Sequence, residues 1–150
     1  MGVDRSYVAR NDASRQRLAA RLDDLTASEL LTPLGDGWTV GGLLAHLAFW
    51  DRLVLERWGL AAREGRTTPI DIDDELVDLV NNAGMPAWLA VNGARLPSLA
   101  LEAAAEVDEA VAALSEESVA ALAEEGRPRL VDRSRHRTLH LDAIEAALGH

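Results

Sequence analysis

Three histidines have the residue type and spacing that could hold a divalent metal ion. His136 and His140 are four residues apart near the end of the chain, and His46 lies in an apolar stretch nearer its start. Residues four apart share one face of an α-helix, so the pair could offer two imidazoles to one ion. Three neutral imidazoles suit zinc, nickel, iron or copper and leave at least one coordination position open for water or substrate. The fourth histidine, His150, is the last residue and is expected to be solvated.

The same three histidines also have a purely structural interpretation. A histidine on an apolar helix face is commonly a hydrogen-bonded core residue, and polar residues recur four apart in helices by chance. Three inward-facing imidazoles without a metal would each need a buried hydrogen-bond partner. The spacing alone leaves both interpretations open.

Three further residues lie close to the histidines in the sequence. Asp132, one helical turn before His136, could orient that imidazole through a hydrogen bond or could cap the start of the helix. Trp50, one turn after His46, could form a wall of a pocket or belong to the core. Asp51 should lie roughly 140° round the helix from His46, so we expect a solvated charge or an ion pair and not a metal ligand.

Hydrophobic periodicity predicts four long helices that position these side chains, with almost no strand signal, and therefore an all-α helical bundle. The long helices are expected over residues 6–25, 40–64 and 97–114, and from a cap at Asp132 or Ser134 to about residue 148. Residues 66–96 form a long link, expected to contain a short helix over 71–80 followed by turns at 81–86. Such a link suggests a crossover, or a lid over a pocket. A second short helix is expected over residues 115–125.

Composition and charge bound the class of protein. At 150 residues the chain is expected to be one domain, residues 1–150, and the absence of cysteine excludes disulfides and thiolate zinc sites and fits the cytoplasm. The formal net charge of -10 disfavours nucleic acid and anionic membranes as partners. No apolar stretch reaches the roughly 18 residues that a membrane span requires, and we expect no signal peptide. A small-molecule substrate is the expected partner.

Two segments resemble motifs of a known protein family. Residues 37–51 read GWTVGGLLAHLAFWD, which is similar to the W-T-V-x-x-L-x-x-H-L pattern that opens the second helix of the DinB/YfiT-like superfamily. Residues 136–144 read HRTLHLDAI, which is similar to the H-x-x-x-H-x-x-x-I pattern on the fourth helix of that family. The superfamily includes the N-terminal domain of mycothiol-dependent maleylpyruvate isomerases.

The resemblance implies a four-helix bundle with up-down-down-up topology and a long crossover between the second and third helices. It also implies that the metal triad of the family corresponds to His46, His136 and His140, with one divalent ion, zinc or nickel, as cofactor. Gly41 and Gly42 depart from the family pattern, and two glycines weaken a helix start unless something packs closely against them. Relatives commonly form dimers, so a homodimer is a candidate assembly.

Activities known in the superfamily centre on low-molecular-weight thiols, either S-transfer of mycothiol or bacillithiol or thiol-assisted isomerisation. The isomerases carry a further C-terminal domain, so maleylpyruvate isomerisation itself is not expected. The leading hypothesis is a metal-dependent thiol S-transferase or a related detoxification enzyme, with the thiol as cosubstrate. The same site could instead activate water for hydrolysis. The alternatives are a non-catalytic protein that binds or sequesters a small molecule, with a vestigial metal site, and a purely structural module.

Overall fold

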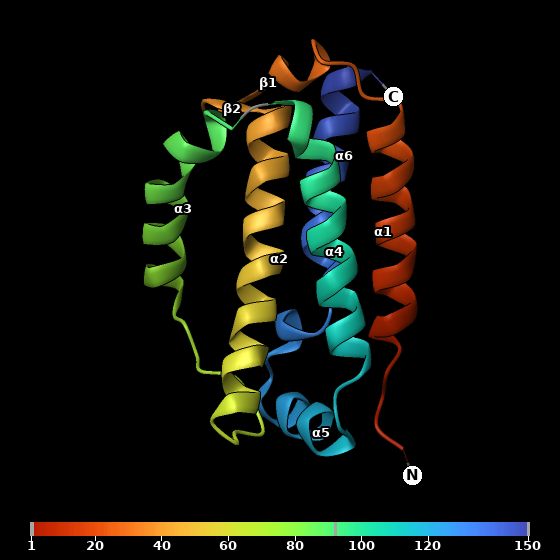
Figure 1. Cartoon of the computed structure of the whole chain (residues 1–150), viewed down its shortest axis with the longest axis vertical. Coiled ribbons are helices and arrows are strands. Elements are labelled where there is room, and N and C mark those ends of the chain that lie inside the picture. The colour runs from red at the N-terminus through yellow and green to blue at the C-terminus, as the bar shows by residue number, and fades with distance from the viewer. Residues whose placement is uncertain (1, 92, 150) are drawn as a thin grey trace.

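Four long helices run side by side along the length of the molecule (Figure 1). They are α1 (Tyr7–Asp23), α2 (Val40–Arg63), α4 (Leu96–Ala112) and α6 (Ser134–Leu148). The computed structural model describes residues 2–91 and 93–149. In Figure 1, α1 and α6 run upward, whereas α2 and α4 run downward. The all-α class expected from the sequence is confirmed.

Because α2 and α4 run in the same direction, the chain must return along the bundle between them. Helix α3 (Asp74–Leu89) makes most of this return on the outside of α2 (Figure 1), and the 3-10 turn η2 (Gly93–Arg95) directly precedes α4. The link between the second and third long helices is therefore a crossover that contains a substantial helix of its own.

The sequence-based expectation for this link needs a correction. The short helix expected over residues 71–80 is longer, and the turns expected at 81–86 are wrong, because α3 continues through Gly84 and Pro86. Pro86 lies near the end of α3, where its missing N–H removes only one helical hydrogen bond. Trp88 is buried at 7% exposure, and a Cβ at Gly84 would lie 2.4 Å from the Trp88 indole. Gly84 thus makes room for Trp88, whose burial stabilises the last turns.

The start of α2 explains the unusual pair of glycines. The Thr39 hydroxyl accepts a hydrogen bond from the Gly42 N–H at 3.0 Å, which is the expected N-cap. A Cβ at Gly41 would lie 3.1 Å from the Leu30 carbonyl oxygen, and one at Gly42 would lie 2.7 Å from the Leu89 side chain. Neighbouring segments therefore approach this backbone too closely for larger residues.

Shorter elements close the two ends of the bundle. At the upper end in Figure 1, η1 (Glu29–Leu31) leads into an antiparallel hairpin of β1 (Pro33–Gly35) and β2 (Trp38–Thr39). At the lower end, α5 (Glu116–Glu125) and η3 (Pro128–Leu130) connect α4 to α6. The second short helix expected from the sequence is therefore present.

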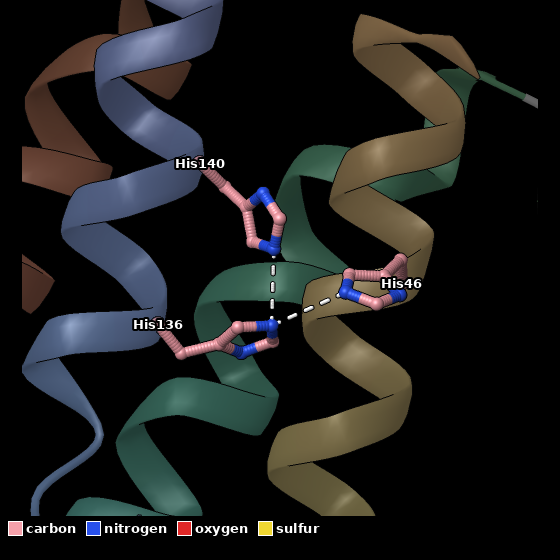
Figure 2. A group of neighbouring side chains, drawn as sticks. All are labelled: His46, His136 and His140. Carbon is pink, nitrogen blue, oxygen red and sulfur yellow. Dashed lines mark hydrogen bonds between the residues drawn. The ribbon is translucent and has the colours of Figure 1, made fainter. Parts of the chain in front are cut away.

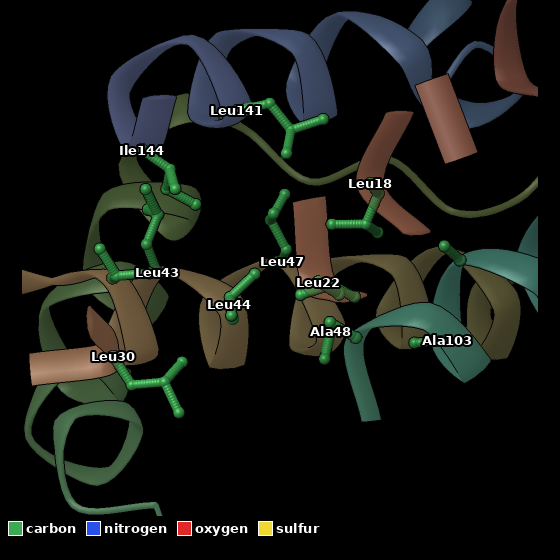
Figure 3. Close-up of a cluster of buried hydrophobic side chains, with 13 residues drawn as sticks. Leu18, Leu22, Leu30, Leu43, Leu44, Leu47, Ala48, Ala103, Leu141 and Ile144 are labelled. Carbon is green, nitrogen blue, oxygen red and sulfur yellow. The ribbon is translucent and has the colours of Figure 1, made fainter. Parts of the chain in front are cut away.

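A cluster of aliphatic side chains from all four long helices forms the main core (Figure 3). Leu141 and Ile144 of α6 are fully buried against leucines of α2. Helix α4 contributes mainly alanines to this cluster, which lets it lie close to α2. The leucines of the cluster are Leu18, Leu22, Leu30, Leu43, Leu44, Leu47 and Leu141.

Within the described residues, no helix is both long and apolar enough to cross a lipid bilayer.

Candidate metal centre

The three imidazoles predicted as metal ligands meet at one point between α2 and α6 (Figure 2). The Nε2 atom of His136 lies 3.1 Å from Nε2 of His46 and 3.0 Å from Nε2 of His140. Among residues 2–91 and 93–149, this is the one group of three or more potential ligands whose donor atoms lie close enough together for an ion. Segments 90 residues apart in the sequence therefore supply a single cluster.

These distances fit coordination better than hydrogen bonding. A ring nitrogen carries either one proton or one lone pair, so Nε2 of His136 cannot form a good hydrogen bond to each neighbour at once. Tetrahedral coordination with metal–nitrogen distances of about 2.0–2.1 Å places ligand nitrogens about 3.3 Å apart. The observed separations of 3.1 and 3.0 Å are close to that value. The residues present therefore fit a divalent ion bound through three Nε2 atoms.

Helix α6 holds two of the histidines on the flank of its buried face. Leu141 and Ile144 lie in the core together with Arg137, and all three are fully buried. His136 and His140 are only half-buried, so the pair faces the side of the bundle. The expectation of inward-facing imidazoles that point towards the core is therefore wrong for this pair. The core stripe of α6 anchors the helix, and the neighbouring stripe presents the two imidazoles.

Aromatic rings surround the third histidine. The His46 ring meets Trp88 edge to face at a centroid distance of 5.1 Å and Trp38 at 5.4 Å, and Trp50 lies at 6.5 Å. The Nδ1 atom of His46 is buried, and no described residue forms a hydrogen bond with it. A metal-bound histidine usually donates this second N–H to an acceptor that orients the ring. Here ring packing takes over that orienting role.

Burial keeps the three imidazoles neutral near pH 7. It lowers the pKa of His46 and of His140 from 6.5 to about 4. Burial also lowers the pKa of His136 to about 2, and repulsion from the neighbouring Arg133 guanidinium adds to that shift. Neutral imidazole is the form that binds metal ions, so no imidazolium proton has to be lost before coordination.

The cluster opens into a cleft of about 1290 Å³ between α3 and α6, with α2 as its floor. Near the histidines its walls are apolar or aromatic, with Trp38, Leu43, Trp50 and Met85 among the lining residues. Such a volume accommodates a small organic molecule. An ion held by three protein nitrogens here would keep a coordination position facing the cleft.

A comparison with family models matches residues 10–150 to the DinB superfamily. The chain belongs to the DinB superfamily. This confirms the resemblance seen in the motifs around Trp38 and His136. No curated protein matches the chain, and no solved structure matches it.

Two other residues singled out in this DinB chain have clear positions. The Asp132 carboxylate accepts hydrogen bonds from the Ser134 N–H at 3.1 Å and from Arg10 Nε at 2.9 Å, so it supports the start of α6 and binds none of the three imidazoles. Trp50 lines the cleft while being 9% exposed, and its Nε1 donates to Asn81 at 2.7 Å. His150 lies outside the described residues.

A buried ion-pair network lies beside the site, and the sequence anticipated only that Asp51 could take part in an ion pair. The Arg137 guanidinium contacts Asp51 at 3.2 Å and Asp108 at 2.7 Å, and Arg133 contacts Asp51 at 2.9 Å. The ion-pair interpretation of Asp51 is thus confirmed, and the solvated one is wrong because the residue is 2% exposed. One pattern in the sequence indicated that Arg137 is buried. Arg137 shares a helical stripe with the apolar residues Leu141 and Ile144, which follow it by four and seven residues.

Arg133 links this network to the metal ligands. Its Nη2 lies 3.4 Å from Nδ1 of His136, and its Nη1 donates to the Arg129 carbonyl at 2.9 Å. A cation beside Nδ1 of His136 favours the neutral tautomer with its proton on Nε2, so binding an ion through Nε2 requires that proton to move to Nδ1. Metal-bound histidines more often face an acceptor at this second nitrogen. No pattern in the sequence indicated this contact.

Proposed function

We propose that this DinB protein is a divalent-metal-dependent enzyme of the cytoplasm that transfers a low-molecular-weight thiol, of the mycothiol type, to a reactive small molecule. The observation that carries the proposal is the convergence of three histidine Nε2 atoms at the wall of a large cleft. The absence of cysteine in the chain means that any thiol must come from a cosubstrate.

Each part of the cleft has a role in this proposal. His46, His136 and His140 hold the ion, zinc or nickel, which when bound stabilises the thiolate form of a thiol and so supplies a nucleophile at neutral pH. Trp38 and Leu43 bind the apolar part of the electrophile and exclude water from it. Related detoxification reactions at the same ion would use the same residues.

A second candidate is a protein that binds and sequesters a small molecule without turnover. It is favoured by the engagement of Asp132 with Ser134 and Arg10, which leaves this carboxylate no proton-transfer contact with the histidines. Under this alternative the cleft provides the affinity, and the metal is an anchor or is absent.

Metal binding is the first test. Purified untagged protein, dialysed and then loaded with zinc or nickel, is expected to retain about one equivalent by elemental mass spectrometry. His46→Ala, His136→Ala and His140→Ala should each lower this content sharply, because two imidazoles hold an ion far more weakly than three. Thr138→Ala, an exposed neighbour on α6, is the matched control and should retain full loading. Full metal content in all three histidine variants would refute the site.

Activity separates the two candidate functions. The metal-loaded protein is incubated with a generic electrophile, with and without a low-molecular-weight thiol, and conjugate formation is followed. Thiol-dependent turnover that is lost in His136→Ala supports the transferase. Saturable binding of the electrophile without turnover supports sequestration instead.

A further inference from the structure

The cleft that contains the histidines has a strongly basic end. The wall of the cleft is rich in arginine where η3 and the start of α6 meet the lower half of α2. The chain has 15 basic residues and a net charge of -10, yet a third of its basic side chains line this one cleft. They are Arg57, Arg127, Arg129, Arg133 and Arg135.

Two of these guanidinium groups are held against each other. Arg57 Nη2 and Arg127 Nη2 both donate to the Ile70 carbonyl oxygen, at 2.6 and 2.9 Å. Arg57 Nε is buried, and no described residue accepts a hydrogen bond from it. Burial lowers the pKa of Arg57, and repulsion from Arg127 and then from Arg133 lowers it further against the opposing effect of Asp71. Two adjacent cations with an unpaired buried donor are what an oxyanion would stabilise.

Nearby carboxylates leave part of this charge uncompensated. Arg127 pairs with Glu125 at 2.8 Å and with Asp71 at 3.6 Å, and Arg133 pairs with Asp51 at 2.9 Å. Within the part of the chain that the structure describes, neither Arg57 nor the exposed Arg129 has a carboxylate within salt-bridge distance. These two cations are therefore available to a ligand.

The basic end and the histidines lie along the same face of one helix. Arg57 follows His46 by eleven residues on α2, which corresponds to about 16 Å along the axis and only about 20° of rotation. Arg133 connects the two regions, since its Nη2 is 3.4 Å from Nδ1 of His136 and its charge also lowers the pKa of Arg57. An extended molecule could therefore contact the histidine end and the arginine end at once.

We propose that Arg57 and Arg129, together with the remaining Nη2 N–H group of Arg127, bind the carboxylate or phosphate group of an elongated anionic ligand whose other end reaches the three histidines. This proposal deepens the proposed function. Only the assignment of a thiol to the ligand end near the histidines rests on that function. The cosubstrate is then an acidic low-molecular-weight thiol in place of the uncharged mycothiol itself, with its anionic group roughly three helical turns from the sulfur.

The anion site is tested on the metal-free protein, independently of the metal. Inorganic phosphate and acetate are titrated separately and followed by the Arg Nε–H signals in NMR spectra. Saturable binding of either anion is expected, and the tighter one identifies the chemical group. Arg57→Gln and Arg127→Gln should weaken it at least tenfold, because each removes a charge-assisted hydrogen bond.

Two further variants make this result decisive. Arg63→Gln removes the same charge from an exposed position on the same helix and should bind like the wild type. Arg129→Gln changes an exposed residue whose loss cannot unfold the chain, and it should weaken binding severalfold. Unsaturable titrations, or equal affinities in wild type and Arg57→Gln, would overturn the proposal.

The connection to the histidines is tested with zinc-loaded protein and two thiols. ω-Mercaptododecanoic acid carries a carboxylate at the far end of an extended chain, whereas its methyl ester does not, and both present the same sulfur. The acid is expected to bind at least tenfold more tightly than the ester to the wild type, and the preference should vanish in Arg57→Gln. If zinc does not bind while phosphate still does, the metal-dependent function fails and the anion site stands. Equal binding of both thiols by the wild type would refute the elongated ligand.

Discussion

His136 is the residue on which the candidate site depends most. Its Nε2 is the atom that both other imidazoles approach, and its Nδ1 faces Arg133. It is also the histidine whose pKa burial lowers furthest, to about 2. A neutral imidazole surrounded by other imidazoles and a cation is costly to protonate, which ties the site to the pH dependence of stability.

The metal-free protein should lose stability as the pH falls from about 6.5 towards 4. The folded pKa values of about 4 for His46 and His140 and about 2 for His136 lie below the value of 6.5 for a free histidine. The unfolded chain therefore binds more protons in this window, and the loss should be on the order of several kcal/mol. Urea unfolding at several pH values measures it.

A triple variant with glutamine at these three positions is the control for the pH effect. It retains all carboxylates, whose titration also contributes below about pH 5. Its free energy of unfolding should change less between pH 6.5 and 4 than that of the wild type. Identical pH profiles would show that the histidines are not buried in the neutral form.

The C-terminal turns of helix α3 are stabilised by the burial of one side chain, Trp88. Gly84→Ala places a methyl group against Trp88, where the Cβ would lie 2.4 Å from the indole. We expect a loss of about 1–3 kcal/mol from overpacking, which exceeds the gain in helix propensity. Trp88 should also move away from His46, and tryptophan fluorescence would detect this.

Gly59→Ala is the matched control for Gly84→Ala. Gly59 is also within a helix, but its Cβ would meet only the flexible end of Arg63, at 3.3 Å. This substitution should stabilise the protein by roughly 0.5–1 kcal/mol through helix propensity alone. Thermal unfolding should therefore show shifts of opposite sign, and shifts of the same sign would contradict the packing argument.

Helix α6 is joined to α2 and α4 by charge as well as by the core. Arg137→Met leaves the buried Asp51 and Asp108 without this shared partner, so we expect a loss of about 3–5 kcal/mol in the free energy of unfolding. Arg135→Met, at an exposed position two residues earlier, should change stability by less than about 0.5 kcal/mol. Similar effects of both substitutions in urea unfolding would argue against the network.

On the scale of the whole molecule, the candidate metal centre connects two distant parts of the chain. An ion that binds only the folded state stabilises it by about 2.7 kcal/mol at a concentration of 100 times its Kd. For a chain of this size, zinc should raise the Tm by roughly 5–10 °C. The His136→Ala variant should show no such rise, and an equal rise in that variant would place zinc elsewhere.

Much of the fold could be predicted because it depends on local interactions. The helices α1, α2, α4 and α6 begin and end within a few residues of the expected bounds, since periodicity and caps such as Thr39 act over one or two turns. The expectation failed for α3, where turn-forming residues at Gly84 and Pro86 are overridden by the burial of Trp88 against α2. Propensity is a weak determinant wherever tertiary packing opposes it.

For this protein, the sequence by itself determined the helical class, the absence of cysteine chemistry, the net charge and which three histidines were candidate metal ligands. Only the tertiary structure decided that their Nε2 atoms converge, that Arg137 is buried between two carboxylates, and that Arg57 and Arg127 form a basic end of the same cleft. The reason is that a charged residue is buried or exposed according to its partners, and Asp51 lies 86 residues from Arg137. Periodicity along one helix carries no information about such pairings.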